Sequence, residues 1–365
     1  MRSFFGLLFV TLPLIVYPST TLPKVEGFVY DSETHEPIPY AHVSYGSIHT
    51  VTNEDGAFSL SFLPVDSIDL RVSFIGYETL RHPITALGQS LQLLLKPAVM
   101  ELQAVTVMTG EYIIEKVLER LRTNYELGSQ YLMCYYKERM RGNEELYYLA
   151  EGILDVYQPS HLSGRSPEIS PIKTRKREFA LLDEEMTMVH GHAGDMLNSI
   201  VRRGGSFIQP KNFKDYDFEY TALSEYNGKE VFVLSFQPKT KKGSAQGKIF
   251  VDSESYAIIK TEYYPRVTKK GFWEEVSWTE EFNKEGILWN LSRVTYNGKW
   301  IYEGIEYRYE SLLLVNESKP VKIPPALGLL LEEKDIFFNA ASDFTENFWE
   351  GYNYMKLNST EMESF

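Results

Sequence analysis

The chain has 365 residues, more than one hydrophobic core usually organises, so two or three domains are expected. The formal net charge of −13 at pH 7 argues against nucleic acid as a partner, because phosphate binding needs clustered Lys and Arg. Apolar residues make up 43% and aromatic residues 14% of the sequence, which argues against global disorder.

Residues 1–20 have the pattern of a secretory signal peptide. Arg2 supplies an early positive charge, an apolar run extends from Phe4 to Val16, and small polar residues follow. This run is shorter than the ~20 apolar residues that a membrane-spanning helix needs, so we expect export to the periplasm or to the outer membrane. No cysteine lies near this segment, so lipidation is not expected. Cys134 is the only cysteine and cannot form an intramolecular disulfide.

Short strands separated by turns run from residue 24 to residue 97 and predict a small antiparallel β-sandwich. Within it, "VTNEDGAFSL" (51–60) predicts a hairpin around Asp55-Gly56, because Gly accepts the positive φ of a primed turn. Phe58 and Leu60 would share its buried face. The turn lacks the spaced oxygen ligands of a calcium loop, so we expect it to hold no metal.

Four segments of this region carry a family resemblance: "GFVYDSETHEPIPYAHV", "TNEDGAFSL", "VSFIGYE" and "LLLKP". In this order they resemble the carboxypeptidase-like regulatory domain, a transthyretin-like sandwich, in a bacterial envelope protein. The resemblance implies the accessory domain without the catalytic one. The following "MELQAVTV" (100–107) resembles the stretch that follows this domain in bacterial outer-membrane receptors.

Residues 98–128 are expected to form a linker and an amphipathic helix. Ile114, Val117 and Leu121 recur at helical spacing and place an apolar stripe on a helix from Glu111 to Leu127. A single amphipathic helix needs an apolar surface to cover, and the following strands would supply it.

Longer strands alternate with turns between residues 129 and 330 and predict an antiparallel meander. The expected fold class is therefore mainly β: a small Greek-key sandwich followed by a helix-capped, curled antiparallel sheet, or half-barrel. "GKIFVDSESYAIIKTEYY" (247–264) is similar to half-barrels of the lipoprotein-carrier type. Hairpin turns are expected at Gly142-Asn143, Asn227-Gly228, Ser253-Glu254, Asn283 to Gly286 and Asn297-Gly298.

Two stretches interrupt the meander, and a tail follows it. "PSHLSGRSPEISPIKTRKR" (159–177) is rich in turn residues and predicts a surface loop with a solvated basic end. "HAGDMLNSIVRRGG" (192–205) predicts a short helix. Residues 331–365 form the expected C-terminal tail, in which "FTENFWEGYNYM" (344–355) resembles the ending of uncharacterised envelope proteins.

The motifs of common hydrolases and nucleotide enzymes are absent from the sequence. None of the seven His has Glu three positions later, as zinc carboxypeptidases require, and "HEPIP" at His35 does not complete a His-Glu-x-x-His motif. "GSAQGK" (243–248) is one residue short of a P-loop, and no Gly-x-Ser-x-Gly elbow occurs. Cys134 lies in an expected strand, where a buried hydrophobe is favoured over a nucleophile.

Paired carboxylates also fail. With Gly142-Asn143 as a two-residue turn, Glu138 and Glu151 would share a sheet face but lie roughly 13 Å apart, since a strand rises about 3.3 Å per residue. Glycosidase carboxylates lie roughly 5 to 9.5 Å apart. We therefore expect no acid–base pair in this hairpin, no enzyme activity and no cofactor.

One cluster has metal-ligand character: His190, His192 and Asp195 in "HGHAGD". No fourth ligand is evident nearby and His-x-His beside Gly is common in loops, so we expect no metal there. Phe365 is a residue type expected at the end of outer-membrane barrels, but the preceding "STEMES" does not alternate, so no transmembrane barrel is expected.

The sequence favours a non-enzymatic envelope protein that binds an apolar ligand, such as a lipid, or an envelope protein. The ligand would lie on the concave face of the sheet, which offers more inward positions than one helix covers. Two alternatives remain open, a scaffold whose half-barrel is filled by its own core side chains and a hydrolase with a scattered site. The candidate ligand-binding residues are Tyr147, Leu149, Ile153, Phe232, Leu234 and Phe236.

Overall fold

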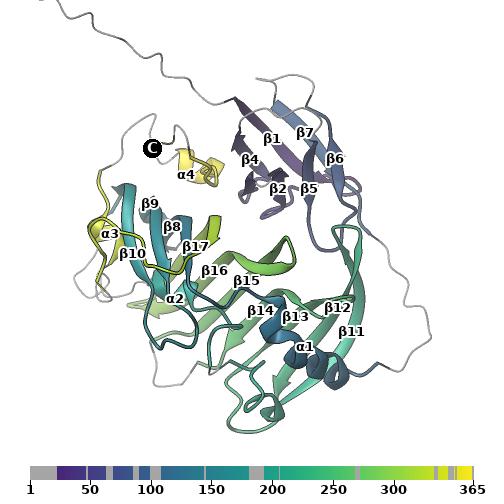
Figure 1. Cartoon of the computed structure of the whole chain (residues 1–365). Helices are drawn as coiled ribbons and strands as arrows, with labels where there is room; N and C mark the ends of the chain where they lie inside the picture. Colours follow the sequence, from purple (N-terminus) through teal and green to yellow (C-terminus); the bar gives the residue numbers. More distant parts are fainter. Residues whose placement is uncertain are drawn as a thin grey trace, which may run out of the picture.

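The computed structural model describes residues 23–46, 48–62, 69–84, 90–98, 108–143, 145–180, 193–204, 206–267, 272–332, 336–343, 349 and 352–363. The predicted signal peptide and residues 99–107 of the predicted linker lie outside these ranges. Figure 1 shows a small N-terminal sandwich, coloured purple and blue, beside a large curled sheet, coloured teal and green. The predicted fold class, a mainly β chain with a small sandwich and a helix-capped curled sheet, is confirmed.

The N-terminal sandwich consists of two small sheets. One has the order β4 (Ala57–Ser61), β1 (Lys24–Asp31), β7 (Ser90–Leu95), and the other has the order β3 (Ile48–Val51), β2 (His42–Tyr45), β5 (Leu70–Ser73), β6 (Leu80–His82). Val29, Val43, Phe58 and Leu70 are fully buried in the core that the two sheets share. β1 and β7 run parallel, so the expectation of purely antiparallel pairing is wrong at this edge.

The predicted hairpin at residues 51–60 is wrong, because β3 and β4 belong to different sheets. Asn53 Oδ1 accepts hydrogen bonds from the backbone N–H groups of Asp55 (3.0 Å) and Ala57 (2.8 Å) and so builds the turn. Gly56 supplies the expected positive φ, +74°. The chain therefore crosses from one sheet to the other here, and apolar alternation alone does not distinguish a crossover from a hairpin.

The described strands after α1 (Gly110–Asn124) form one antiparallel sheet of ten strands, in the order β10-β9-β8-β17-β16-β15-β14-β13-β12-β11. The meander runs from β11 to β17, and β8 to β10 add to its last strand. The strands are β8 (Gln130–Gly142), β9 (Glu145–Gln158), β10 (Glu168–Glu178), β11 (Tyr216–Tyr226), β12 (Lys229–Pro238), β13 (Ala245–Asp252), β14 (Ile258–Pro265), β15 (Glu275–Glu285), β16 (Leu288–Tyr302) and β17 (Ile305–Pro320).

The predicted register of the β8–β9 hairpin is wrong because the pairing shifts at a bulge between Met140 and Arg141. Glu138 pairs with Ala150, and Lys137 pairs with Glu151. Consecutive residues of a strand point to opposite faces, so Glu138 and Glu151 lie on opposite faces of the sheet.

Asn297-Gly298 is not a turn, although the dipeptide predicts one. β16 continues through it, and the chain turns instead after Tyr302 at Glu303-Gly304. A Cβ on Gly298 would lie 2.3 Å from the ring of Trp273. The glycine is therefore required for the close approach of an aromatic ring rather than for a turn.

The predicted surface loop at 159–177 is wrong over its second half, which forms the edge strand β10. Pro171 lies at a register shift, where a missing N–H costs no ladder hydrogen bond. Arg175 is buried and forms an ion pair with Glu151, which is fully buried, so part of the basic run is not solvated.

Two helices and a connecting segment cover one face of the large sheet, which we call the helix-covered face. α1 buries Ile114, Val117 and Leu121, as the predicted stripe requires, against β11 to β16 (Figure 1). The segment after α2 (Ala193–Leu197) adds Ile200 and Phe207 to this core. The short helix α3 (Phe337–Ala340) covers the part of the face formed by β8 and β9.

The C-terminal segment, residues 352–363, lies between the sandwich and the opposite face of the large sheet. Its helix α4 (Ser359–Glu363) begins with a capping box, in which Asn358 and Glu361 exchange hydrogen bonds with each other's backbone N–H groups. Asp55 accepts a hydrogen bond from the N–H of Ser359 at 2.6 Å. The acidic turn of the sandwich therefore holds the C-terminal segment in place.

Five charged side chains form what we call the Arg139 cluster: Glu54, Lys137, Arg139, Glu310 and Glu361. Arg139 contacts Glu54 at 2.9 Å, Glu310 at 2.6 Å and Glu361 at 2.6 Å. Lys137 contacts Glu361 as well, at 2.5 Å, and Glu361 is completely buried. The cluster therefore ties together the sandwich, the sheet and the C-terminal segment.

Replacing Glu361 by Ala should lower the free energy of unfolding by about 3 to 5 kcal/mol, because the change leaves the charges of Lys137 and Arg139 buried with fewer partners. Urea unfolding followed by circular dichroism measures the loss. Glu317→Ala, which breaks an exposed ion pair with Lys319, is the control and should leave the transition in place. Equal effects of the two changes would contradict a structural role for the cluster.

Glu138 is a second buried carboxyl group, on the helix-covered face. Its Oε2 accepts hydrogen bonds from Tyr136 OH and Tyr309 OH, each at 2.8 Å, and its Oε1 accepts one from the N–H of Phe338 at 3.0 Å. Burial raises the pKa of Glu138 to about 7, although these three hydrogen bonds oppose the rise. The folded protein therefore favours the protonated form of this group more than the unfolded chain does.

Because the folded-state pKa lies above the unfolded value of 4.5, Glu138 lowers stability as pH rises from about 4.5 to about 7. The loss should reach about 3 kcal/mol, at 1.36 kcal/mol for each pKa unit. Glu138→Gln should remove this contribution, so the difference in unfolding free energy between variant and wild type should change with pH over that interval. A difference that stays constant from pH 5 to pH 8 would show that Glu138 does not titrate as described.

Candidate functional site

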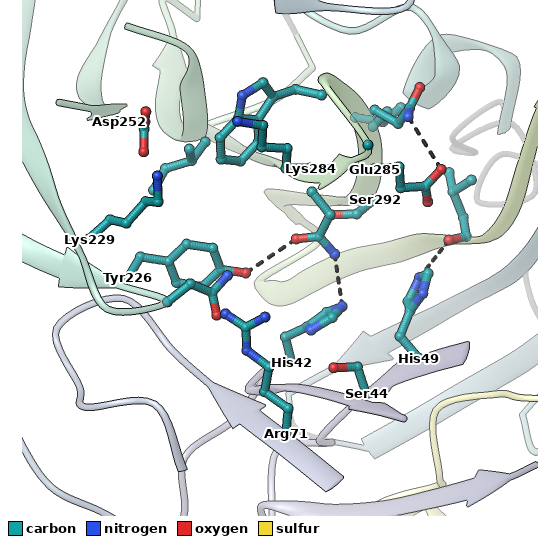
Figure 2. Close-up of a pocket in the computed structure, with 18 of the residues that line it drawn as sticks. His42, Ser44, His49, Arg71, Tyr226, Lys229, Asp252, Lys284, Glu285 and Ser292 are labelled. Carbon is teal, nitrogen blue, oxygen red and sulfur yellow. Dashed lines mark hydrogen bonds between the residues drawn. The ribbon is translucent and has the colours of Figure 1, made fainter. Parts of the chain in front are cut away.

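A cavity of about 590 Å³ opens where the sandwich meets the large sheet, and we call it the sandwich–sheet cleft. It lies where two strands separate: β14 pairs with β15 from Lys260 to Tyr263, and β15 then continues to Glu285 without β14 beside it. Figure 2 shows side chains from both parts around the space. They include His42, Ser44, His49, Arg71, Tyr226, Asn227, Lys229, Asp252, Asn283, Lys284, Glu285 and Trp289.

Three hydrogen-bonded side chains connect the sheet to the sandwich across this cleft (Figure 2). Tyr226 OH donates to Asn283 Oδ1 at 3.2 Å, and Asn283 Nδ2 donates to His42 Nε2 at 2.8 Å. With the amide in this orientation, His42 Nε2 is an acceptor and the imidazole proton lies on Nδ1.

His42 is held in its neutral form. Burial lowers the pKa of His42 well below its usual value of 6.5, and the nearby His49, Arg71 and Arg293 lower it further. The two imidazole ring centres lie 5.1 Å apart, and His49 Nε2 donates to the carbonyl oxygen of Val315 at 2.8 Å. The histidines therefore act as hydrogen-bonding groups that also connect β2 and β3 to the large sheet.

The comparisons with known proteins identify the N-terminal part. Residues 25–107 match the family model described as a CarboxypepD_reg-like domain. The sandwich is a CarboxypepD_reg-like domain. The sequence resemblance to the carboxypeptidase-like regulatory domain is thereby confirmed, and the sandwich side of the cleft, with His42, Ser44, His49 and Arg71, belongs to this domain.

Solved structures show weaker similarity to the chain. A domain assigned to outer-membrane lipoprotein sorting from Vibrio parahaemolyticus is 14% identical, with a TM-score of 0.31, over 63% of this chain and 98% of the other. A DUF1329 family protein from Desulfovibrio piger is 13% identical, with a TM-score of 0.26, over 57% of this chain and 93% of the other. Both are half-barrel proteins, the class that the C-terminal strands resemble in sequence. The low identities and TM-scores support no conclusion about function. No curated protein matches the chain significantly.

Three of the six predicted ligand-binding residues lie in the core beneath α1. Phe232, Leu234 and Phe236 are 6%, 0% and 3% exposed and pack in the same cluster as Ile114 and Val117 of the helix. These three residues therefore pack as the scaffold alternative expects, in which the half-barrel is filled by its own core side chains.

The other three predicted residues are not brought together with them. Ile153 lies on the opposite face, packed against Tyr135 and Leu312, and Leu149 is fully buried. Tyr147 packs against the helix-covered core beside Tyr148, because the bulge in the β8–β9 pairing breaks the expected alternation. None of the six lines the sandwich–sheet cleft. Ligand binding by these residues stays a prediction.

The predicted metal cluster is only partly visible. His190 and His192 lie outside the described residues, and among the described residues no group of three potential ligands has metal-binding geometry. Asp195 lines a second cavity, of about 580 Å³, between residues 158–169 and α2. There Arg202 already donates to the carbonyl oxygens of Pro159, Glu126 and Gly128 and to Gln130, and Arg165 forms an ion pair with Glu168, so both arginines have partners within the protein.

Sequence reasoning missed the cleft because its residues belong to no motif. His42 and Arg71 lie on separate strands of the CarboxypepD_reg-like domain, and Asn283 lies more than two hundred residues later on β15. One signal was present in the sequence. The strand-like segment "FWEEVSWTEEFNKEG" is longer than the strand-like segment before it, so its end would extend beyond its partner strand. Among the described residues, no helix has the length and apolar character needed to span a membrane.

We expect His42 to remain neutral at pH 6, with its proton on Nδ1, because protonation would remove the acceptor for Asn283 and place a charge beside Arg71. Nuclear magnetic resonance of ¹⁵N-histidine-labelled protein reports both the tautomer and the titration midpoint. His35, which lies on an exposed turn of the same domain, is the internal control. A midpoint near 6.5 for His42 would contradict the buried hydrogen-bonded arrangement.

Proposed function

We propose that this chain is a non-enzymatic, exported protein of the bacterial cell envelope that binds a small polar ligand in the sandwich–sheet cleft. One observation carries the proposal: a cavity of about 590 Å³ with polar and charged groups supplied by both parts of the protein. Cavities of roughly 300 to 1,000 Å³ with a few convergent polar groups are typical ligand sites.

Among the described residues, the part of the helix-covered face beneath α1 is filled by side chains of the protein itself. Apolar residues of α1 and of the segment after α2 pack against the strands, as described above. A ligand there would have to displace about as much apolar surface as it buried. The polar cleft therefore replaces the apolar concave face as the proposed site, and the predicted lipid becomes a less favoured occupant.

The hydrolase alternative has a specific candidate in the same cleft. Ser44 on β2 pairs across the ladder with His49 on β3, and both residues line the cavity. A hydrolase would need this pair to work as nucleophile and base. Screening the purified protein against ester, amide and phosphoester substrates tests this directly. Turnover that Ser44→Ala abolished would overturn the non-enzymatic assignment.

A large side chain in the cleft should prevent ligand binding. Native mass spectrometry of the full chain, purified from the envelope fraction of its host, should reveal a bound small molecule in the wild type and none in Ser44→Phe, because the phenyl ring would occupy the sandwich side of the cavity, beside His42 and Arg71. Ser90→Phe, at an exposed position on β7 away from the cleft, should retain the ligand. Cooperative melting of both variants verifies folding. Absence of bound mass from wild type and variants alike would favour a scaffold without ligand.

A further inference from the structure

Several charged groups of the sandwich–sheet cleft have no ion-pair partner among the described residues. Asp252 Oδ1 accepts hydrogen bonds from the N–H (2.7 Å) and hydroxyl (2.6 Å) of Ser255, and Glu285 accepts one from Ser318 at 3.2 Å, but these donors are neutral. Of the cations, Lys229 forms an ion pair with Glu254. Arg71 and Lys284 form no ion pair with any carboxylate among the residues that the structure describes.

Arg71 is the more informative of these two cations. It lies half-buried on β5, and its Nε atom is inaccessible to solvent with no hydrogen-bond partner among the described residues. Burial lowers the pKa of Arg71, but a guanidinium group stays charged in proteins. A buried donor without a partner on a charged group is costly, and such groups are usually satisfied by a ligand or by water.

The nearby neutral groups favour a negatively charged ligand as well. His42 cannot provide a second positive charge, but its Nδ1–H is a hydrogen-bond donor, and Figure 2 shows the ring beside Arg71. Lys284 comes from the other wall, the sheet, at the end of β15. A guanidinium matches two oxygens of phosphate or carboxylate, so Arg71 is suited to bind an oxyanion in the cleft, and Lys284 adds a second positive charge to its lining.

We propose that the ligand of the sandwich–sheet cleft carries an oxyanion, a phosphate or a carboxylate group, held between Arg71 and Lys284. This inference rests on the proposed function and adds the chemical class of the ligand. The net charge of −13 means that most of the protein surface repels anions. An anionic ligand would therefore bind only where local cations lack carboxylate partners.

The test uses the dialysed full chain and measures binding of inorganic phosphate, succinate and glycerol 3-phosphate by calorimetry at constant ionic strength. At least one of these probes should bind, and Arg71→Gln and Lys284→Gln should each weaken its binding at least tenfold. Lys319→Gln removes a cation that lies outside the cleft and should leave the affinity unchanged. Melting curves verify that the variants fold. Arg71→Lys should recover part of the loss, because it restores the charge without the planar guanidinium.

A second arm distinguishes a soluble anion from a lipid headgroup. Vesicles of phosphatidylglycerol and phosphatidylcholine are sedimented with the protein. Binding of glycerol 3-phosphate without sedimentation identifies a soluble ligand, and Arg71-dependent sedimentation with phosphatidylglycerol vesicles identifies a headgroup. Either result supports the oxyanion.

Two results would overturn the inference, and they have different meanings. If native mass spectrometry shows a bound molecule that Ser44→Phe loses but Arg71→Gln and Lys284→Gln retain, the cleft binds a ligand of another chemical class. The proposed function then survives and the oxyanion does not. If no molecule copurifies and no anionic probe or vesicle binds, both proposals fail.

Discussion

The arrangement of the whole molecule depends on the Arg139 cluster. A buried charge is tolerated only when partners surround it, and here the partners come from different parts of the chain: Glu54 from the sandwich, Glu310 from β17 and Glu361 from the C-terminal segment. Arg139 therefore cannot be satisfied unless all three parts are in place. Apolar contacts between Trp349 and Tyr135 accompany the ion pairs, but contacts of that kind tolerate sliding. The ion pairs specify one position of the sandwich against the sheet, and that position leaves the cleft open where β14 and β15 separate.

The two faces of the large sheet have different chemistry, and this difference is the reason for proposing the ligand site on one face rather than the other. α1, α3 and the segment after α2 pack against the helix-covered face. Glu138 of β8 is buried on this face and accepts three hydrogen bonds. The opposite face carries ion pairs such as Arg293 with Glu281 and meets a polar surface of the CarboxypepD_reg-like domain. Polar surfaces pack less completely than apolar ones and leave room between them. The proposed ligand site accordingly lies between the sandwich and the sheet rather than inside the half-barrel.

Hydrophobic periodicity was sufficient to predict the fold class, the stripe of α1 and the hairpin at Asn227-Gly228, where Tyr226 pairs with Lys229 as expected. It failed where a side chain or a tertiary contact decides the outcome. Asn53 turns the chain between two sheets, Gly298 admits the ring of Trp273, and the bulge beside Met140 shifts the β8–β9 register. The cleft could not be predicted for a related reason. Its polar residues look like ordinary exposed strand positions until the position of the sandwich is known, and that position depends on ion pairs between residues far apart in the sequence.

The Arg139 cluster and the cleft share no residue, yet both depend on the same contact between sandwich and sheet. A ligand that bridges Arg71 and Lys284 would add a bond across this contact, and any molecule that binds only the assembled form stabilises it in proportion to its concentration over its dissociation constant. Conversely, weakening the cluster lets the two walls of the cleft move apart. Ligand binding must then supply the free energy that holds the walls together. The apparent affinity equals the intrinsic affinity multiplied by the fraction of molecules in which sandwich and sheet are assembled. The ion pairs would thus preorganise the proposed site without touching it. Apolar side chains of similar volume could stabilise the same junction, but they would not specify the separation of Arg71 from Lys284.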